Sequence, residues 1–355
     1  IVSRELGIPA VVGTEKATQI LKDEQEITVD GTNGKVYSGK TVIKEQEKVE
    51  DWHGDKLKTK TKIYMNLGEP NLAERYKNLP FDGIGLMRLE FLITSYINEH
   101  PMHMIEENRG NEYIEKVAEG ISKVASAINP RPIIVRFSDF KTNEYKNLKG
   151  GEKFEEQEDN PMIGWRGVSR YISKEFVEAF KLEIQAIKKV REKYRNVHVM
   201  LPFVRTVEEV RIVLGIMASE GLIRNDYFKI YLMAEVPAMS LIPEEFAKLD
   251  IDGVSIGSND LTQLVLGVDR DSEKLGRLGY FDERNKAVLK AMSNILKTFK
   301  DNGKTTGICG QSVSNYPEII EFLVNHNIDS VSVNPDKVVE AMKHIYDMEN
   351  QIHNN

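Results

Sequence analysis

From residue 61 to its end, the chain alternates short apolar segments with amphipathic helical segments. Runs of β-branched and apolar residues predict eight strands, at 61–67, 83–88, 132–137, 197–203, 229–235, 253–258, 305–309 and 329–333. Helices are expected between them, for example at 110–128, 174–195, 206–220, 284–301 and 315–326. This alternation, over about 280 residues, is typical of a (β/α)8 TIM barrel. An open doubly wound sheet is the alternative, but residues 68–71 lack the glycine-rich turn it would need.

The segment before the barrel has a different pattern. Residues 1–43 are expected to form a small unit with a helix through 1–7, a short buried strand over 8–13, a helix over 14–22 and a β-hairpin over 25–39. A charged helical linker is expected over 44–60, with Trp52 as a docking point, followed by the barrel over 61–348 and a tail over 349–355. The chain starts without Met or a signal-peptide pattern, so we interpret it as a fragment of a longer polypeptide.

Composition narrows the class of protein. The net charge of −7 has the opposite sign to the charge of a typical nucleic-acid-binding face. No apolar run is close to the length that a membrane-spanning helix needs. A single cysteine, Cys309, excludes an internal disulfide and is typical of a reducing compartment. We therefore expect a cytoplasmic protein that binds neither nucleic acid nor membrane.

Polar side chains gather where the predicted strands end, which is where the active groups of such barrels lie. They are Arg88, Glu90, Arg136, Asp139, Lys141, Arg166, Glu235, Asn259, Asp260, Asp269, Arg270 and Cys309. Plainer interpretations exist: Glu235 and Asp260 as capping or ion-paired acids, Asp139 paired with Lys141, and Cys309 as an inert buried thiol.

The balance of these charges points to a ligand. Guanidinium groups bind phosphate and carboxylate bidentately, so four arginines at one mouth favour a small, multiply anionic substrate. Two carboxylates, Glu235 and Asp260, suit Mg²⁺ better than zinc, which prefers nitrogen and sulfur ligands. Together they are typical of phosphoryl transfer.

These strand ends carry sequence blocks of a known family. The blocks are GIGLMRLEFL, VRFSDFK, NPMIGWRG, LMAEVP, IGSNDLTQ, GVDRD and GICGQ. In this order they resemble the phosphoenolpyruvate-utilising enzymes. The opening IVSRELGIPAVVGT and the hairpin VDGTNGKVYSG are similar to the end of that family's swivelling phosphohistidine domain. The resemblance covers nearly the whole chain.

The resemblance implies a role for each matching residue. It implies Mg²⁺, or Mn²⁺ in its place, bound by Glu235 and Asp260, and a proton moved at the methylene carbon by Cys309. Asn259 would bond the phosphoryl group. The implied substrate-binding residues are Arg88, Arg136, Lys141, Arg166, Gly257, Ser258, Asn259 and Arg270, and the implied catalytic residues are Arg88, Arg136, Asn259 and Cys309.

Within the family, the resemblance is strongest to the branch that converts ATP, pyruvate and water to AMP, phosphoenolpyruvate and phosphate. Pyruvate phosphate dikinase and the phosphotransferase-system enzyme I are siblings, in which we expect glutamate at the position of Gln311. A barrel kept only for oligomerisation is a further alternative.

The resemblance also implies partners. The family's phosphohistidine motif, Thr-Ser-His or Thr-Cys-His, does not occur among the chain's seven histidines. We therefore expect pyruvate or phosphoenolpyruvate as ligand, the nucleotide-binding and phosphohistidine segments of the same protein as partners, and a homo-oligomer. On its own, this chain is expected to be inactive in the overall reaction.

Two further segments have expected structural roles. His100 and His103 resemble a metal pair only superficially, and we expect them to lie in a surface turn. Trp165 is expected to pack beneath the arginine that follows it, Arg166.

Overall fold

The computed structural model describes residues 3, 8–42 and 52–353. The chain divides into two compact units, Ile1–Gly54 and Asp55–Asn355. Apart from Ser3, the expected helix at 1–7 lies outside the described residues, as do residues 44–51 of the charged linker. Residues 52–60, the described part of that linker, form no helix, so the helical prediction is wrong there.

The smaller unit contains the expected hairpin. Strands β1 (Ile27–Asp30) and β2 (Lys35–Ser38) pair antiparallel, and helix α2 spans Ala17–Ile20. The Asp30 Oδ1 accepts the backbone N–H groups of Thr32 and Asn33, which closes the turn. The strand predicted at 8–13 is wrong: these residues pair with no described strand, and Val12 is 88% exposed. A β-branched run without a partner strand has no ladder to join.

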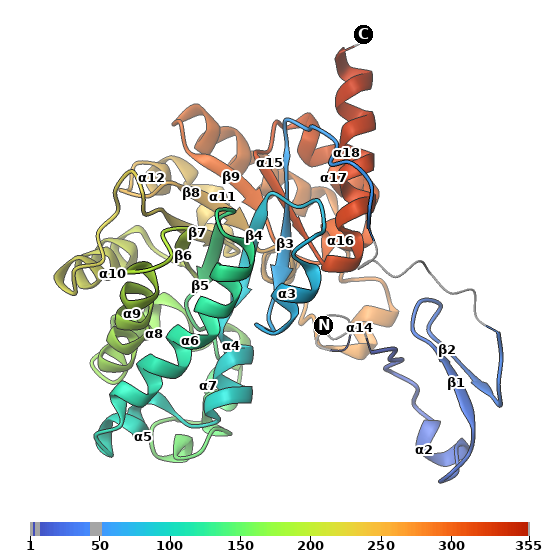
Figure 1. Cartoon of the computed structure of the whole chain (residues 1–355), viewed down its shortest axis with the longest axis horizontal. Coiled ribbons are helices and arrows are strands. Elements are labelled where there is room, and N and C mark those ends of the chain that lie inside the picture. The colour runs from blue at the N-terminus through green and yellow to red at the C-terminus, as the bar shows by residue number, and fades with distance from the viewer. Residues whose placement is uncertain (1–2, 4–7, 43–51, 354–355) are drawn as a thin grey trace. The chain divides into compact units, whose positions relative to one another are not determined.

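The larger unit is a closed barrel of eight parallel strands, which confirms the predicted fold class. Around the barrel they run β10-β3-β4-β5-β6-β7-β8-β9 (Figure 1). Their bounds are β3 Lys62–Leu67, β4 Gly83–Arg88, β5 Ile133–Arg136, β6 Val197–Leu201, β7 Ile230–Ala234, β8 Gly253–Ile256, β9 Thr305–Ile308 and β10 Ser330–Val333. The first and last strands close the ring, with Val331 beside Ile63.

Helices surround these strands (Figure 1). They are α3 Leu72–Tyr76, α4 Leu89–Leu92, α5 Pro101–Glu106, α6 Gly110–Ile128, α7 Thr142–Lys146, α8 Val168–Tyr171, α9 Val177–Arg191, α10 Val207–Ser219, α11 Pro237–Leu241, α12 Pro243–Ala247, α13 Ser258–Leu266, α14 Glu273–Arg277, α15 Lys286–Asp301, α16 Ser312–Asn315, α17 Pro317–Asn325 and α18 Val338–His353. Short π and 3₁₀ turns lie at Ile93–Ile97, Gly151–Lys153, Pro161–Ile163 and Pro335–Lys337. None of the described helices is long and apolar enough to cross a membrane.

Capping explains where the predicted helices begin. The side chain of Thr206 accepts the N–H of Glu209, and that of Asn285 accepts the N–H of Ala287, so α10 and α15 start just after these residues. The predicted strand at 197–203 stops earlier than expected, at Leu201, because Pro202 cannot donate to the ladder. The following residue, Phe203, therefore belongs to a loop at the rim of the barrel.

The barrel interior is filled by side chains. Leu86, Ile134, Met200, Met233 and Cys309 form one buried cluster inside the ring. The outer face of the strands packs against apolar stripes such as that of α15, which buries Val288, Met292, Ile295 and Phe299. The barrel is thus a packed scaffold whose strand ends project polar side chains from one rim.

Candidate active site at the strand ends

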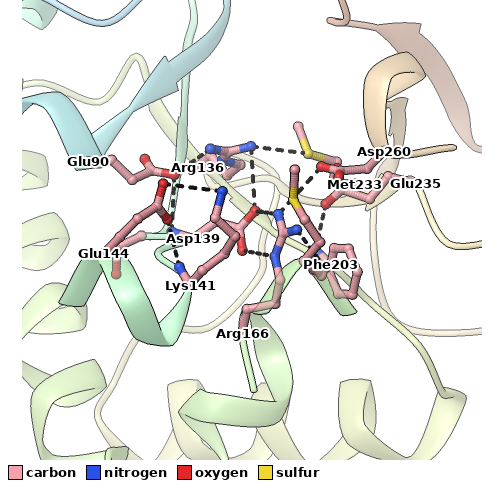
Figure 2. Close-up of polar contacts among 12 residues, drawn as sticks. Glu90, Arg136, Asp139, Lys141, Glu144, Arg166, Phe203, Met233, Glu235 and Asp260 are labelled. Carbon is pink, nitrogen blue, oxygen red and sulfur yellow. Dashed lines mark hydrogen bonds and ion pairs between the residues drawn. The ribbon is translucent and has the colours of Figure 1, made fainter. Parts of the chain in front are cut away.

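Three carboxylates from three different strand ends converge at this rim. Asp139 follows β5, Glu235 follows β7 and Asp260 lies in the first turn of α13, after β8. All three are buried, and one oxygen of each lies within 4.8 Å of the others. The sequence assigned a metal to Glu235 and Asp260, whereas it placed Asp139 among the strand-end polar groups without a metal role and left pairing with Lys141 as the plainer interpretation. Figure 2 shows Asp139 turned instead toward Arg166 and the other two acids.

The pKa values of two of these acids, Glu235 and Asp139, are shifted in opposite directions. Burial raises the pKa of Glu235 well above its usual value, and the nearby charges of Asp260 and Asp139 add to this. Burial also opposes ionisation of Asp139, but the charge and hydrogen bonds of Arg166 outweigh it and lower its pKa. A cation that lay among the three oxygens would relieve the repulsion at Glu235.

One atom of this cluster lacks a partner. The Asp260 Oδ1 is buried and, among the described residues, accepts no hydrogen bond. A buried carboxylate oxygen without a donor is costly unless a cation or water completes it. An all-oxygen donor set with an unpartnered oxygen fits a hard divalent cation such as Mg²⁺.

Arginines surround the carboxylates. Arg166 donates from Nε and Nη2 to both oxygens of Asp139, at 3.0 and 2.6 Å, and its Nη2 lies 3.4 Å from Asp260 Oδ2. The Nη1 of Arg270 lies 3.7 Å from the same Asp260 oxygen. Arg136 pairs with Glu90 and lies beside Arg88 in the sheet register. The structure therefore brings together all four arginines predicted from the sequence.

The guanidinium groups of Arg136 and Arg166 stay charged. Burial disfavours the charge on Arg136 and Arg166, but the neighbouring carboxylates, chiefly Glu90 for the first and Asp139 for the second, raise both pKa values. The rim is thus a dense alternation of fixed positive and negative charge in a poorly solvated place, where charge on a ligand is recognised strongly.

Cys309 and Asn259 lie on the adjoining strand ends. The Cys309 thiol is buried, with Sγ 3.7 Å from the carbonyl oxygen of Ile256, and burial raises its pKa to about 11. The Oδ1 of Asn259 accepts the backbone N–H of Gln311 at 3.2 Å. That bond orients the amide at the rim.

The side chains of Ser258 and Lys141 have other partners than the sequence predicted. The Ser258 hydroxyl is fully buried and donates to Glu283 Oε1 at 2.8 Å, so we assign this side chain no contact with a ligand. Lys141 does not pair with Asp139, because its Nζ lies 3.4 Å from Glu144 Oε1 and Arg166 takes both oxygens of Asp139.

Gly257 provides room for the side chain of Glu235. A Cβ at this position would lie 2.6 Å from Glu235 Oε2, so the small residue lets the carboxylate reach the strand end. If Glu235 is a metal ligand, we expect Gly257→Ala to weaken Mn²⁺ binding by about 10–100-fold, because the added Cβ would displace the end of that side chain. Because that side chain can move aside, the variant should still fold.

Titration of Mn²⁺ by calorimetry, with a thermal melt of each variant, measures both quantities. Gly215→Ala in α10 is the matched control, since nothing lies within 4 Å of its added Cβ. Equal Mn²⁺ affinity in Gly257→Ala and the parent chain would remove Gly257 from the site.

Two sequence predictions, for His100 and Trp165, are wrong because of contacts made by the segment between β5 and α9. His100 is fully buried, not in a surface turn, because its Nε2 lies 2.9 Å from Glu155 Oε1, and Glu155 also forms a buried ion pair with Arg170. Trp165 packs under Arg170, whose guanidinium carbon lies 4.0 Å from the indole centroid, and not under Arg166. Both errors have one cause: a buried Glu155–Arg170 pair that local sequence does not indicate.

Comparison with known proteins follows the same division of the chain. Residues 42–350 match the family model described as "PEP-utilising enzyme, PEP-binding domain", where PEP is phosphoenolpyruvate, and residues 1–34 match "PEP-utilising enzyme, mobile domain". The chain is 56% identical over 368 residues to phosphoenolpyruvate synthase of Aeropyrum pernix, covering 99% of this chain and 44% of that protein. It is 42% identical over 424 residues to phosphoenolpyruvate synthase of Aquifex aeolicus, covering 99% and 49%. The chain spans about half the length of the curated relatives it matches.

Proposed function

Because this chain belongs to the PEP-utilising enzyme family and carries that family's PEP-binding domain, we propose that its barrel is the pyruvate and PEP site of a phosphoenolpyruvate synthase. The observation that carries the proposal is the cluster of three buried carboxylates in contact with three arginines, Arg136, Arg166 and Arg270. The whole protein would convert ATP, pyruvate and water to AMP, PEP and phosphate. The barrel would serve the step between a phosphohistidine, carried by another segment of the protein, and the enol form of pyruvate.

Asp139, Glu235 and Asp260 are the residues we assign to Mg²⁺, with Mn²⁺ as a substitute. When bound, the ion would neutralise charge on the enolate and phosphoryl oxygens. The unpartnered Asp260 Oδ1 and the raised pKa of Glu235 both support a cation at this place.

The arginines recognise the anion in this proposal. Arg136 presents a planar guanidinium group that fits a phosphate or carboxylate bidentately. Arg166, whose Nε and Nη2 are held by Asp139, adds fixed positive charge, as do Arg88, Arg270 and Lys141 at the edge. The Asn259 amide would donate to the phosphoryl group, and Gly257 leaves the backbone accessible to the ligand. Burial of Arg166 means that the ion pairs it forms are little weakened by water.

The thiol of Cys309 would handle the proton. Formation of PEP from pyruvate removes a proton from the methyl carbon, and the reverse reaction returns one to the methylene carbon. A buried thiol whose pKa is raised to about 11 is protonated at neutral pH, so it suits the delivery of a proton.

Calorimetric titration of the 355-residue chain with PEP or its analogue oxalate, with and without Mg²⁺, tests the proposal. Binding that strengthens with Mg²⁺ is expected, because the anion supplies oxygen ligands that the protein lacks. If neither anion binds in the presence of Mg²⁺ or Mn²⁺, the proposed function is wrong.

Substitution of the arginines by lysine tests the anion clamp. We expect Arg136→Lys and Arg166→Lys each to weaken PEP binding by about 1–3 kcal/mol, since an ammonium group cannot reproduce a bidentate fork in a buried site. The matched control is Arg224→Lys, whose arginine pairs with Asp250 and Asp252 before β8. Unchanged PEP affinity in both site variants, measured by the same titration, would contradict the clamp.

A further inference from the structure

Phe203 adopts a conformation that is rare for its residue type. It follows the proline that ends β6, and its φ of 49° lies in the left-handed region, which bulky residues seldom occupy. The side chain is only 1% exposed, so packing on all sides holds the backbone there. Such strained positions persist only where the surroundings over-determine them, and they gather at functional sites.

The backbone of Phe203 contacts one of the assigned metal ligands. Its N–H donates to Glu235 Oε1 at 2.7 Å (Figure 2). This bond occupies one carboxylate oxygen and so orients the other, Oε2, which borders Gly257. The loop after β6 therefore determines how Glu235 presents itself to a cation.

The ring of Phe203 contacts one of the arginines that we assign to anion binding. The guanidinium carbon of Arg166 lies 4.1 Å from the ring centroid, and that of Arg205 lies 4.6 Å from it. A cation over an aromatic face is attracted to it, more strongly when water is excluded. Phe203 therefore contacts both kinds of residue in the site. Its backbone N–H bonds to Glu235, which we assign to the cation, and its ring lies against Arg166, which we assign to the anion.

The loop that carries Arg166 is fastened to the same turn. Arg205 donates to the carbonyl oxygen of Gly164 and, at 2.9 Å, to Ser169 Oγ, while the Val168 N–H donates to the Pro202 oxygen at 3.2 Å. A Cβ on Gly167 would lie 2.5 Å from that Pro202 oxygen and 2.7 Å from Phe203 Cβ. The close approach requires glycine and leaves Arg166 little freedom relative to Phe203.

We propose that Phe203 is a positioning residue that holds Arg166 and Glu235 in register, and so couples cation binding to anion binding at this rim. The inference rests on the proposed function. Coupling of this kind is reciprocal: Mn²⁺ strengthens oxalate binding by the same factor as oxalate strengthens Mn²⁺ binding, and we infer that Phe203 sets a large part of that factor.

The test is calorimetry on the 355-residue chain with Mn²⁺ alone, oxalate alone and oxalate at saturating Mn²⁺. In Phe203→Leu, which keeps the bulk but loses the aromatic face, the factor by which Mn²⁺ strengthens oxalate binding should fall at least about tenfold. Mn²⁺ affinity without oxalate should change much less, because the backbone N–H to Glu235 remains. Phe203→Tyr keeps the ring and should restore the coupling.

Phe228→Leu is the matched control, since Phe228 is equally buried and has the guanidinium carbon of Arg191 4.6 Å from its ring centroid, away from the carboxylate cluster. Phe203→Asn removes the ring but tolerates left-handed backbone, so it replaces Phe203→Leu if the latter does not fold.

Full coupling in both ring-deleted variants, or equal loss in Phe228→Leu, would overturn the positioning role and leave the proposed function standing. A parent chain that binds neither Mn²⁺ nor oxalate would overturn both.

Discussion

Asp260→Asn should abolish the part of oxalate binding that depends on Mg²⁺. Asp260 has one oxygen near Arg166 and Arg270, and the other, Oδ1, is buried without a hydrogen-bond partner. An amide has nearly the same shape as a carboxylate but no charge, so the variant should keep the packing and lose the cation. We expect metal affinity to fall by at least about 100-fold, which corresponds to about 2.7 kcal/mol.

The substitution should also affect Glu235. Burial is the main cause of the raised pKa of Glu235, and the charge of Asp260 is the next. Without Asp260, Glu235 should ionise more readily, so residual metal binding would come from Glu235 and Asp139 alone. Two carboxylates cannot offset the lost charge, because hard cations gain affinity with each anionic oxygen.

Calorimetry of oxalate in the presence and absence of Mg²⁺ measures this effect. Asp250→Asn is the matched control: it is the same chemical change at an exposed acid that pairs with Arg224. If Asp260→Asn binds oxalate with an undiminished response to Mg²⁺, the three-carboxylate assignment is wrong, and the acids serve only to pair with the arginines.

The barrel could be predicted from the sequence because its strands are encoded locally. Each has its own short β-branched or apolar run, as in Val254 to Ile256, and a closed parallel sheet places all the carboxyl ends of its strands at one rim. Glu235 and Asp260 could be assigned for the same reason, since Glu235 directly follows β7 and Asp260 lies in the first turn of the helix after β8.

Residues on long loops could not be assigned this way. Asp139 lies close to Lys141 in sequence, but its partner in space is Arg166, 27 positions away. The buried pair of Glu155 and Arg170 organises that loop, and nothing in the local pattern distinguishes it from a surface pair. Phe203 gave no signal beyond the proline before it, because its role depends on a left-handed turn that packs against two other loops.

Cys309→Ala should slow the exchange of pyruvate methyl protons for deuterium by at least about 100-fold, the contribution typical of a positioned acid or base. The assay contains the chain, Mg²⁺ and inorganic phosphate in heavy water, and proton NMR follows the methyl signal. Cys309 lies in the buried interior cluster at the end of β9, and Arg136 opposes the burial that raises the pKa of the thiol. The thiol is thus close to the rim that we assign to the anion.

The pH dependence separates the cysteine from other bases. With a pKa of about 11, only about one thiol in 10⁴ is ionised at pH 7, and the thiolate fraction rises about tenfold for each unit of pH below the pKa. Exchange that uses the thiolate should therefore still be rising between pH 7 and 9, whereas a histidine base would already have reached its plateau.

Cys309→Ser keeps a proton on a smaller and less acidic group, so it controls for the packing lost in Cys309→Ala. Exchange of the pyruvate methyl protons should be slower in Cys309→Ser than in the parent chain. Exchange that persists in Cys309→Ala with the same pH profile would assign the proton to another group. Because the neutral thiol predominates at physiological pH, proton delivery to PEP needs no prior ionisation, and proton removal from pyruvate does. The same residue should therefore limit synthesis of PEP more than its consumption.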